Sequence, residues 1–275
     1  MQKSSLALTG LFGALLLVGF GGATPAKADV QTIREFNNAV WVSGGPSFFN
    51  YKEPSPPPNL PDSERGWIPS VDGGLSVMGF GHSPEFLENA YVALDGGVAF
   101  GKAQYNGAFL LVPTTPVQST TNETVSTFNG RLGRGFVIGK YAMLIPYVEI
   151  GFRDWERELS SIQKEHYQNY DSSGGLLLQV SPMNRLVFSA YGSGGTTFGG
   201  TMRADGYTYN LADSALYKMG AKLAVGVTSR IELFGALDYD AFRYGHSQVV
   251  GDGTYEPNSR TKETKLRVGI GYHFR

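Results

Sequence analysis

The C-terminal segment of the chain alternates between apolar and polar side chains. The apolar set, on one face of an extended segment, is Leu266, Val268, Ile270, Tyr272 and Phe274. The opposite face carries Lys265, Arg267, Gly269, Gly271 and His273. A period of two is the spacing of side chains along a β-strand. The segment Lys265–Arg275 is therefore predicted to be a strand whose apolar face is covered either by a second sheet or by lipid.

The start of the chain has the pattern of a secretory signal peptide. Lys3 precedes an apolar run from about Leu6 to Phe20, and Ala26-Lys27-Ala28 follows just before Asp29. A charged start, a short apolar region and a small-residue cleavage site define such a signal. The alternative is an N-terminal anchor helix, but the run is short for a membrane span. We expect residues 1–28 to be removed and residues 29–275 to fold as one domain outside the cytoplasm.

Composition limits what this exported domain can be. After Phe20 no apolar run approaches the roughly 20 residues of a membrane helix, so the mature chain is either soluble or crosses a membrane as a β-barrel. Cysteine is absent, which excludes disulfides, a thiol nucleophile and a lipoprotein anchor. Charged residues make up 17% of the chain, against about 25% in typical soluble domains. The net charge of -1 argues against nucleic acid as a partner.

Alternating segments recur along the whole mature chain. The predicted strands are Val40–Lys52, Trp67–Phe80, Tyr91–Lys102, Val125–Ile138, Leu144–Phe152, Tyr170–Val180, Arg185–Ser193, Ala215–Val227, Ile231–Ala241 and Lys265–Arg275. In the fourth of these, Arg134 falls on the apolar face, and a β-bulge near Gly133 would correct the alternation.

The connections between these strands alternate in length. The predicted long loops are Glu53–Ser63, the stretch with Pro113 and Pro116 up to about Glu123, Arg153–Glu165, Gly194–Asp213 and Arg243–Thr261. The predicted short turns are Gly81–Glu85, Lys140–Met143, Ser181–Asn184 and Thr228–Arg230. All short turns then lie on the side of the chain ends. Short periplasmic turns and long outer loops are typical of outer-membrane barrels, whereas a soluble sandwich has no reason to keep this order. The sequence predicts an all-β fold, a transmembrane antiparallel up-and-down β-barrel of about ten strands.

Two motifs place the chain beside a known group. The strand start Leu144-Ile145-Pro146-Tyr147-Val148-Glu149-Ile150-Gly151 and the end Arg267-Val268-Gly269-Ile270-Gly271-Tyr272-His273-Phe274 resemble those of the small bacterial outer-membrane β-barrel superfamily, which includes OmpA-like, OmpX-like and opacity-protein-like barrels. The resemblance implies a location in the cell outer membrane of a Gram-negative bacterium, contact with outer-membrane lipid, and recognition of the C-terminal strand by the barrel-assembly machinery. Arg275, one residue beyond the expected final Phe274, departs from the pattern.

Charged side chains are expected inside the barrel. Antiparallel pairing of the last two strands would put Asp238 opposite Arg267 and Asp240 opposite Lys265, all facing inward. Further interior charges would come from Glu149, Arg153, Asp72, Asp95, Lys218 and Lys222. We interpret the set as a lumen ladder of ion pairs that neutralises buried charge. The alternative is an ion-conducting or ligand-binding ring. About ten strands favour a filled or narrow lumen.

Some barrels of this kind are enzymes, and their catalytic residues follow characteristic sequence patterns. Omptin-type proteases use an Asp pair facing Asp-x-His; Asp238-Tyr239-Asp240 offers the former, but Asp-x-His does not occur. Lipid A deacylases use His-x-Ser, whereas His82-Ser83 and His246-Ser247 are adjacent pairs whose side chains would diverge in a strand. The four histidines show no ligand spacing typical of a metal site. We therefore predict no catalytic, cofactor-binding or metal-binding residues, and no cofactor.

The remaining expectations concern aromatic residues and function. Trp41, Trp67 and Trp155 are predicted to belong to the aromatic girdles at the membrane interfaces, with a carbohydrate-stacking surface at Trp155 and Tyr207–Tyr209 as the alternative. We predict an integral outer-membrane barrel with a structural or surface-interaction role and no catalytic activity. The alternatives are a narrow passive porin for small solutes and, more remotely, an outer-membrane hydrolase. The sequence does not define the partner of the outer loops.

Overall fold

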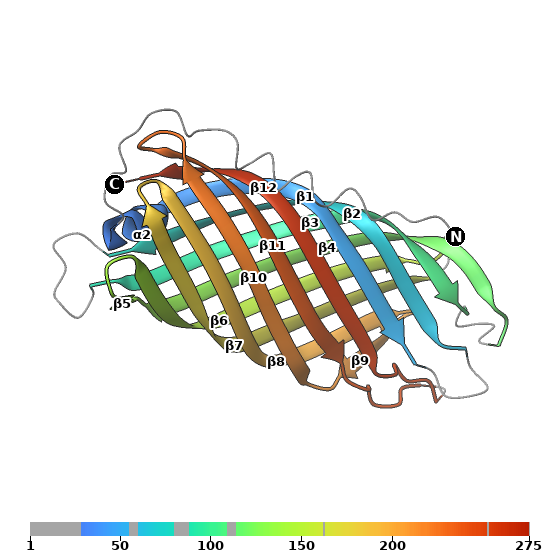
Figure 1. The fold of residues 1–275 in the computed structure, drawn as a ribbon. Helices are drawn as coiled ribbons and strands as arrows, with labels where there is room; N and C mark the ends of the chain where they lie inside the picture. Colours follow the sequence, from blue (N-terminus) through green and yellow to red (C-terminus); the bar gives the residue numbers. More distant parts are fainter. Residues whose placement is uncertain are drawn as a thin grey trace.

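The computed structural model describes residues 29–54, 60–79, 88–108, 114–161, 163–251 and 253–274. These residues form one twisted antiparallel sheet that is rolled into a tilted barrel, with a short helix at one end (Figure 1). The predicted signal peptide, the predicted turn Gly81–Glu85 and Pro113 lie outside the described residues.

The helix is α2 (Val30–Phe36). The strands are β1 (Ala39–Glu53), β2 (Asp62–Met78), β3 (Ala90–Gly107), β4 (Val117–Arg134), β5 (Phe136–Ile138), β6 (Ala142–Glu158), β7 (Lys164–Met183), β8 (Leu186–Ala204), β9 (Tyr207–Leu211), β10 (Ser214–Gly226), β11 (Ile231–Tyr244) and β12 (Ser259–His273). Among the described residues, no helix has the length and apolar character that a membrane-crossing helix requires.

Ten of these strands close the barrel. β5 follows β4 and pairs with β6, and β9 pairs only with the end of β8, so neither adds a strand to the barrel wall. The first and last strands pair along their full lengths, from Ala39 opposite His273 to Lys52 opposite Arg260. The remaining strands of the barrel wall follow in chain order, with β8 paired to β10. The predicted closed barrel of about ten strands is confirmed.

Side-chain alternation divides the strands into an outer apolar face and an inner polar face. On β12, Val268 and Ile270 are exposed on the outside, as predicted, whereas His273 is buried inside. The apolar band runs from Val40 to Phe48 on β1, and on β6 it runs from Leu144 to Phe152. Beyond this band, toward the long loops, the outward residues become polar. The apolar band is the part of the barrel that lipid would cover.

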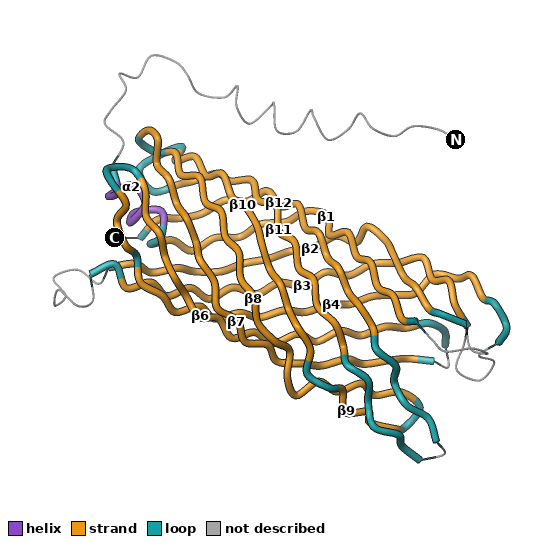
Figure 2. Tube along the Cα trace, turned by 60° about the horizontal axis from the view of Figure 1, so that its bottom comes forward, coloured by secondary structure: helices purple, strands orange, loops and turns teal. Residues whose placement is uncertain are grey.

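The strands extend further toward the long-loop end than the sequence predicted. The predicted loop Arg153–Glu165 is wrong, because β6 continues to Glu158 and β7 begins at Lys164. The predicted loop Gly194–Asp213 is also wrong, because β8 continues to Ala204 and turns into β9. β4 begins at Val117, inside a stretch predicted as loop. In Figure 2, β9 lies at the end of the barrel opposite α2. Backbone pairing continues there although the outward residues are no longer apolar.

The irregularity predicted near Gly133 lies two residues later. Gly133 keeps its register opposite Tyr91 and Tyr147. The ladder is interrupted instead at Gly135, whose N–H donates to the carbonyl oxygen of Asn89 at 2.8 Å. A Cβ atom at Gly135 would collide with the Sδ atom of Met143, so a larger residue there would require that side chain to move. Gly135 thus separates β4 from β5, while Arg134 stays exposed on the outside.

Helix α2 closes the barrel end that carries the short turns. The Asp29 carboxylate caps the helix by accepting a hydrogen bond from the Gln31 N–H. Ile33 is fully buried, and the ring centroid of Phe36 lies 4.6 Å from that of His273. Just after the helix, the Asn37 side-chain amide donates to Oε1 of Gln179 at 2.6 Å. The lead-in to the first strand therefore folds back as a plug.

The outer apolar face generates a first prediction. Val148 on β6 and Val249 in an outer loop are each 61% exposed, but only Val148 lies in the middle of the apolar band. In lipid vesicles, Val148→Arg should lower the free energy of unfolding by about 2–4 kcal/mol, the cost of arginine on the lipid face near the bilayer midplane. Val249→Arg, the matched control, should change it little. Urea titrations measure both, and equal effects would contradict a lipid-covered band.

Candidate functional site: the barrel interior

Interior side chains fill the barrel in three tiers. The lower tier, next to α2, is apolar and includes Ile33, Met143 and Ile145. The middle tier is charged and surrounds a cavity of about 210 Å³. The upper tier, toward the long loops, is a cluster of aromatic rings with carboxylates among them. Six acidic and six basic residues line the middle cavity, so its wall is close to neutral overall.

Lys218 is the centre of the middle tier. Its Nζ atom lies 2.7 Å from Oε1 of Glu149, 2.9 Å from Oδ1 of Asp171 and 3.1 Å from Oδ1 of Asn129. Glu149 also accepts a hydrogen bond from Arg131, which forms a second ion pair with Asp95 at 3.3 Å. The network joins β3, β4, β6, β7 and β10. Glu149, predicted from sequence as a lumen charge, is thus paired on two sides.

The predicted register of the last two strands is wrong by two residues. Asp238 lies opposite Lys265, and Asp240 lies opposite Glu263. The prediction assumed that the two strands start from a common lower edge. Instead, the C-terminal strand continues past the start of β11, where the His273 N–H donates to the carbonyl oxygen of Arg230. A long loop joins the two strands, so no tight turn fixes their register.

The residues of the predicted ladder nevertheless face the same lumen. Arg267 reaches diagonally to Asp238, with 2.6 Å between Nη2 and Oδ2. Lys265 instead bridges to Asp72 on β2 at 2.9 Å.

Arg153, another predicted lumen residue, has its partner on a distant strand. Nη2 of Arg153 lies 3.0 Å from Oε2 of Glu263, and the Arg153 guanidinium carbon lies 4.7 Å from the centroid of the Phe242 ring. Asp240 lines the cavity beside these groups. The ion pairs therefore cross the lumen as well as linking neighbouring strands. Such links tie opposite walls of the barrel together.

Two of the three tryptophans are not in an interface girdle. Trp155 is fully buried inside, stacked on Tyr167 with 4.8 Å between ring centroids. Trp41 faces the lumen, with the Arg267 guanidinium carbon 5.4 Å from its ring centroid. Only Trp67, which is 61% exposed, lies on the outer face. The predicted girdle is therefore wrong for Trp41 and Trp155, because the alternation of their strands turns both inward. Because Trp155 is buried, its ring cannot form the carbohydrate-stacking surface considered as the alternative.

Arg157 holds the upper tier together. Its guanidinium lies 4.6 Å from the Tyr51 ring centroid and pairs with Glu64 at 2.9 Å and with Glu165 at 2.6 Å. Close by, the Trp155 N–H donates to Oε2 of Glu123 at 2.6 Å. Sequence analysis missed this tier because it assigned residues 153–165 to a loop.

Carboxyl groups outnumber cations in this upper tier. Burial, with nearby Asp62 as the next cause, raises the pKa of Glu53 to about 7. Burial, with nearby Glu64 as the next cause, raises the pKa of Glu123 to about 8. Both groups lie beyond the apolar band. The tier therefore holds protons at neutral pH that the unfolded chain would release.

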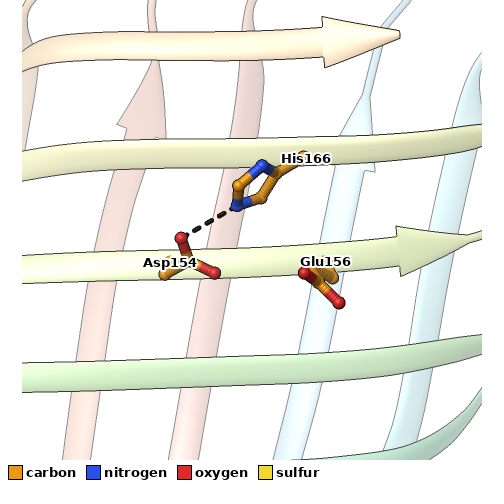
Figure 3. Close-up of side chains that lie close together, drawn as sticks. All are labelled: Asp154, Glu156 and His166. Atoms are coloured by element: carbon orange, nitrogen blue, oxygen red, sulfur yellow. Dashed lines mark hydrogen bonds and ion pairs between the residues drawn. The ribbon is translucent and has the colours of Figure 1, made fainter.

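A third group of polar residues lies on the outside of the barrel, just beyond the apolar band. His166 on β7 faces Glu156 on β6, and its Nε2 atom lies 2.8 Å from Oδ2 of Asp154 (Figure 3). One ligand atom from each residue lies within 4.8 Å of the others. Nitrogen and carboxylate donors of this kind suit a divalent transition metal. Sequence analysis missed the cluster because it did not pair these two strands here.

A closed ten-stranded barrel with an apolar outer band and a charged interior has the fold of an outer-membrane β-barrel protein. Comparison with solved structures agrees. The chain is similar to the outer membrane protease OmpT from Escherichia coli, with a TM-score of 0.59, 8% sequence identity, and coverage of 86% of this chain and 97% of OmpT. At this identity the likeness concerns the fold alone.

Weaker likenesses are to Neisserial surface protein A, with a TM-score of 0.33, 9% identity and coverage of 86% and 97% of the two chains, and to the transport unit of the autotransporter AIDA-I from Escherichia coli, with a TM-score of 0.40, 11% identity and coverage of 88% and 92%. No protein-family model matches the chain, and no curated protein matches its sequence.

The Lys218 network generates a second prediction. Lys218→Met leaves the carboxylates of Glu149 and Asp171 without their shared cation, and breaking a buried pair in this way costs about 3–5 kcal/mol. We expect a loss of that size in the free energy of unfolding, measured by urea titration of the refolded barrel. Lys164→Met, which removes an exposed lysine paired with Glu158, is the control and should change stability little. Equal losses of stability in the two variants would contradict a stabilising role of the Lys218 network.

The upper tier generates a third prediction. Since folding raises the pKa of Glu53 and Glu123, the folded state binds more protons than the unfolded state. The free energy of unfolding should therefore fall as pH rises from about 5 to about 8, by up to about 1.4 kcal/mol for each unit of pKa shift. Glu123→Gln should flatten this slope and stabilise the barrel at pH 9. Glu156→Gln, outside the barrel, is the control. A slope that Glu123→Gln leaves unchanged would contradict the assignment.

Proposed function

We propose that the protein resides in the bacterial outer membrane as a closed, non-conducting barrel with a structural or surface-interaction role and no catalytic activity. The observation that carries the proposal is the filling of the lumen at three successive levels. α2 covers the lower end, the Lys218 network crosses the middle, and the Arg157 cluster occupies the upper end. Buried hydrogen bonds or ion pairs connect the side chains within each level.

The outer loops support a role in surface interaction. The β8–β9 hairpin is held against the loop of residues 245–258 by a bridge between Leu211 and Ser247. A hydrogen bond of 3.1 Å between the Tyr209 and Thr254 hydroxyls adds to this contact. Tyr207 and Val249 remain exposed on the same assembly, at 40% and 61%. An ordered surface with exposed aromatic and apolar groups suits contact with another macromolecule.

The absence of catalysis is part of the proposal. Asp238, the first residue of the acidic pair considered from sequence, is engaged by Arg267 and by the Tyr191 hydroxyl at 3.0 Å. The His166–Asp154 pair faces outward at the edge of the lipid-covered band, away from the lumen. The protease activity named for OmpT belongs to that protein, and a likeness of fold does not transfer it.

A narrow passive pore is the second candidate, favoured by the middle cavity of about 210 Å³. A small solute in this cavity would meet a nearly balanced set of charges. It would leave only if α2 moved at the lower end and the Arg157 cluster rearranged at the upper end. The pore therefore requires motion at both ends, whereas the closed barrel requires none.

Conductance of planar bilayers tests the closed state. The refolded protein should give no steady single-channel steps, and a variant lacking Val30–Phe36 should also give none, because the two upper tiers still fill the lumen. Steps from the parent protein would overturn the proposal. Steps from the deletion variant alone would identify a pore closed by α2, which is the second candidate.

Incubation with peptide and lipid A substrates tests the remaining part of the proposal. Both substrates should stay intact. Cleavage that is lost in His166→Ala but kept in Glu158→Ala would instead identify a hydrolase that uses the outward His166–Asp154 pair.

A further inference from the structure

Cations gather on the outer face of five adjacent strands, just beyond the apolar band. They are Arg243 on β11, Arg260 and Lys262 on β12, Lys52 on β1, Arg65 on β2 and Lys102 on β3. These six residues are called the cationic face below. β11, β12, β1, β2 and β3 follow one another around the barrel (Figure 1), so the face is continuous across the line where the sheet closes.

The register aligns these cations in rows. Arg260 lies directly opposite Arg243 on one side and directly opposite Lys52 on the other. In the next row of outward-facing residues, which lies closer to the apolar band, Asn50 lies between Lys262 and Arg65. Neighbouring strands are about 4.8 Å apart, so the backbone positions of the three cations in the first row span about 10 Å.

In the part of the chain that the structure describes, no anion compensates the cationic face. Among the described residues, none of the six has an ion pair with a carboxylate, whereas the lumen cations Arg131, Arg153, Lys218, Lys265 and Arg267 are all paired. The acidic residues of β1 and β2 at this level, Glu53, Asp62 and Glu64, lie at inward-facing strand positions. Like charges directly opposite in a sheet are destabilising. The first row therefore calls for an external anion.

The opposite side of the barrel shows that this segregation is not general. At the outer ends of β6 and β7 the outward residues Asp154, Glu156 and Glu158 lie beside His166 and Lys164. Opposite charges compensate one another there. The cationic face, by contrast, carries charges of one sign.

The surface below the cationic face suits an acyl chain. A shallow groove on β11, β12 and β1 is lined by Val42, Gly44, Leu233, Val268 and Ile270. Gly44 and Gly235 lie opposite Val268 on either side, so the outer surface is low on both sides of that valine. Between the groove and the cations, Phe48 packs against Trp67 with 5.1 Å between ring centroids. Aromatic pairs of this kind typically mark the level of the lipid headgroups.

We propose that the cationic face binds the phosphate groups of a phosphorylated, acylated lipid in the outer leaflet, and that an acyl chain of the same molecule follows the apolar face toward the Val268 groove. The charge complementarity fixes the headgroup as anionic. The position just above the apolar band fixes it as a lipid headgroup, because a soluble anion would gain nothing from the groove below.

The test uses the full chain refolded in zwitterionic detergent micelles. The probe is diphosphoryl lipid A, with fully dephosphorylated lipid A as its neutral counterpart, and binding is read by native mass spectrometry and thermophoresis. The variant Lys52→Gln/Arg243→Gln/Arg260→Gln should bind diphosphoryl lipid A roughly 100-fold more weakly than the parent, from about fivefold per cation at an anionic lipid surface. Binding by the parent should weaken as salt is raised.

The matched control is Arg134→Gln/Lys140→Gln/Arg230→Gln, which removes three exposed cations at the short-turn end. It should bind like the parent, and heat-modifiable gel migration confirms that each variant folds. If the triple variant does not fold, the single variant Arg260→Gln and the salt titration decide.

Equal binding by the triple variant and the parent would overturn the proposal, as would an equal loss in the control. Equal binding of the dephosphorylated lipid, or displacement of lipid by millimolar inorganic phosphate, would also overturn it. None of these outcomes depends on whether the barrel conducts.

Discussion

The pairing of β1 with β12 is the interaction on which the rest of the structure depends. It joins the two ends of the sheet from Ala39 opposite His273 to Lys52 opposite Arg260, and it leaves neither strand with a free edge. In a membrane the backbone has no water to bond to, so a sheet can cross only when it closes. Closure also gives the sheet an inside and an outside. Each side chain must then face either the lipid or the lumen, according to its parity along the strand.

The inside of a ten-stranded barrel has to be filled, and this chain fills it with charge where the outside is apolar. Desolvating an ion pair is costly, and the cost is recovered only when each charge has several well-placed partners. Lys218 has three such partners and Arg131 pairs with two carboxylates. These contacts link strands that are not neighbours, such as β6 with β10. The interior thus stabilises the circular shape that the backbone pairing alone leaves deformable.

The sequence could predict the fold from the part of the barrel that lipid covers, because the alternation there is apolar outside and polar inside. Above the band the alternation inverts. Trp155 and Tyr167 point inward, whereas Glu156 and His166 between them point outward. If outward residues are expected to be apolar, as they are in the lipid-covered part, such a segment resembles a polar loop. For this reason residues 153–165 were assigned to a loop. The period of two was still present, but the faces had exchanged polarity because water replaces lipid outside.

Register was the other quantity that single-strand patterns could not supply. Asp238 and Arg267 were predicted to lie directly opposite each other. They form an ion pair as diagonal neighbours, and Lys265 reaches β2 instead. Parity decides which face a residue takes, and it is unchanged by a slip of two residues. The sequence therefore located the lumen residues without fixing their partners. The cation–aromatic tier around Arg157 escaped for the reason given above, since residues 153–165 were assigned to a loop.

A closed sheet also separates two sets of charges that a net charge adds together. The lumen carries nearly equal numbers of acids and bases, held to one another by short contacts. On the outer surface the cationic face spans β11 to β3, while at β6 and β7 carboxylates lie beside Lys164 and His166. Exposed charges more than about 10 Å apart are screened from one another in salt, so each face acts on its own surroundings. A net charge of -1 is therefore compatible with a strongly cationic surface at one side of the barrel, and the relevant quantity for a partner at the membrane is the local row of Arg243, Arg260 and Lys52.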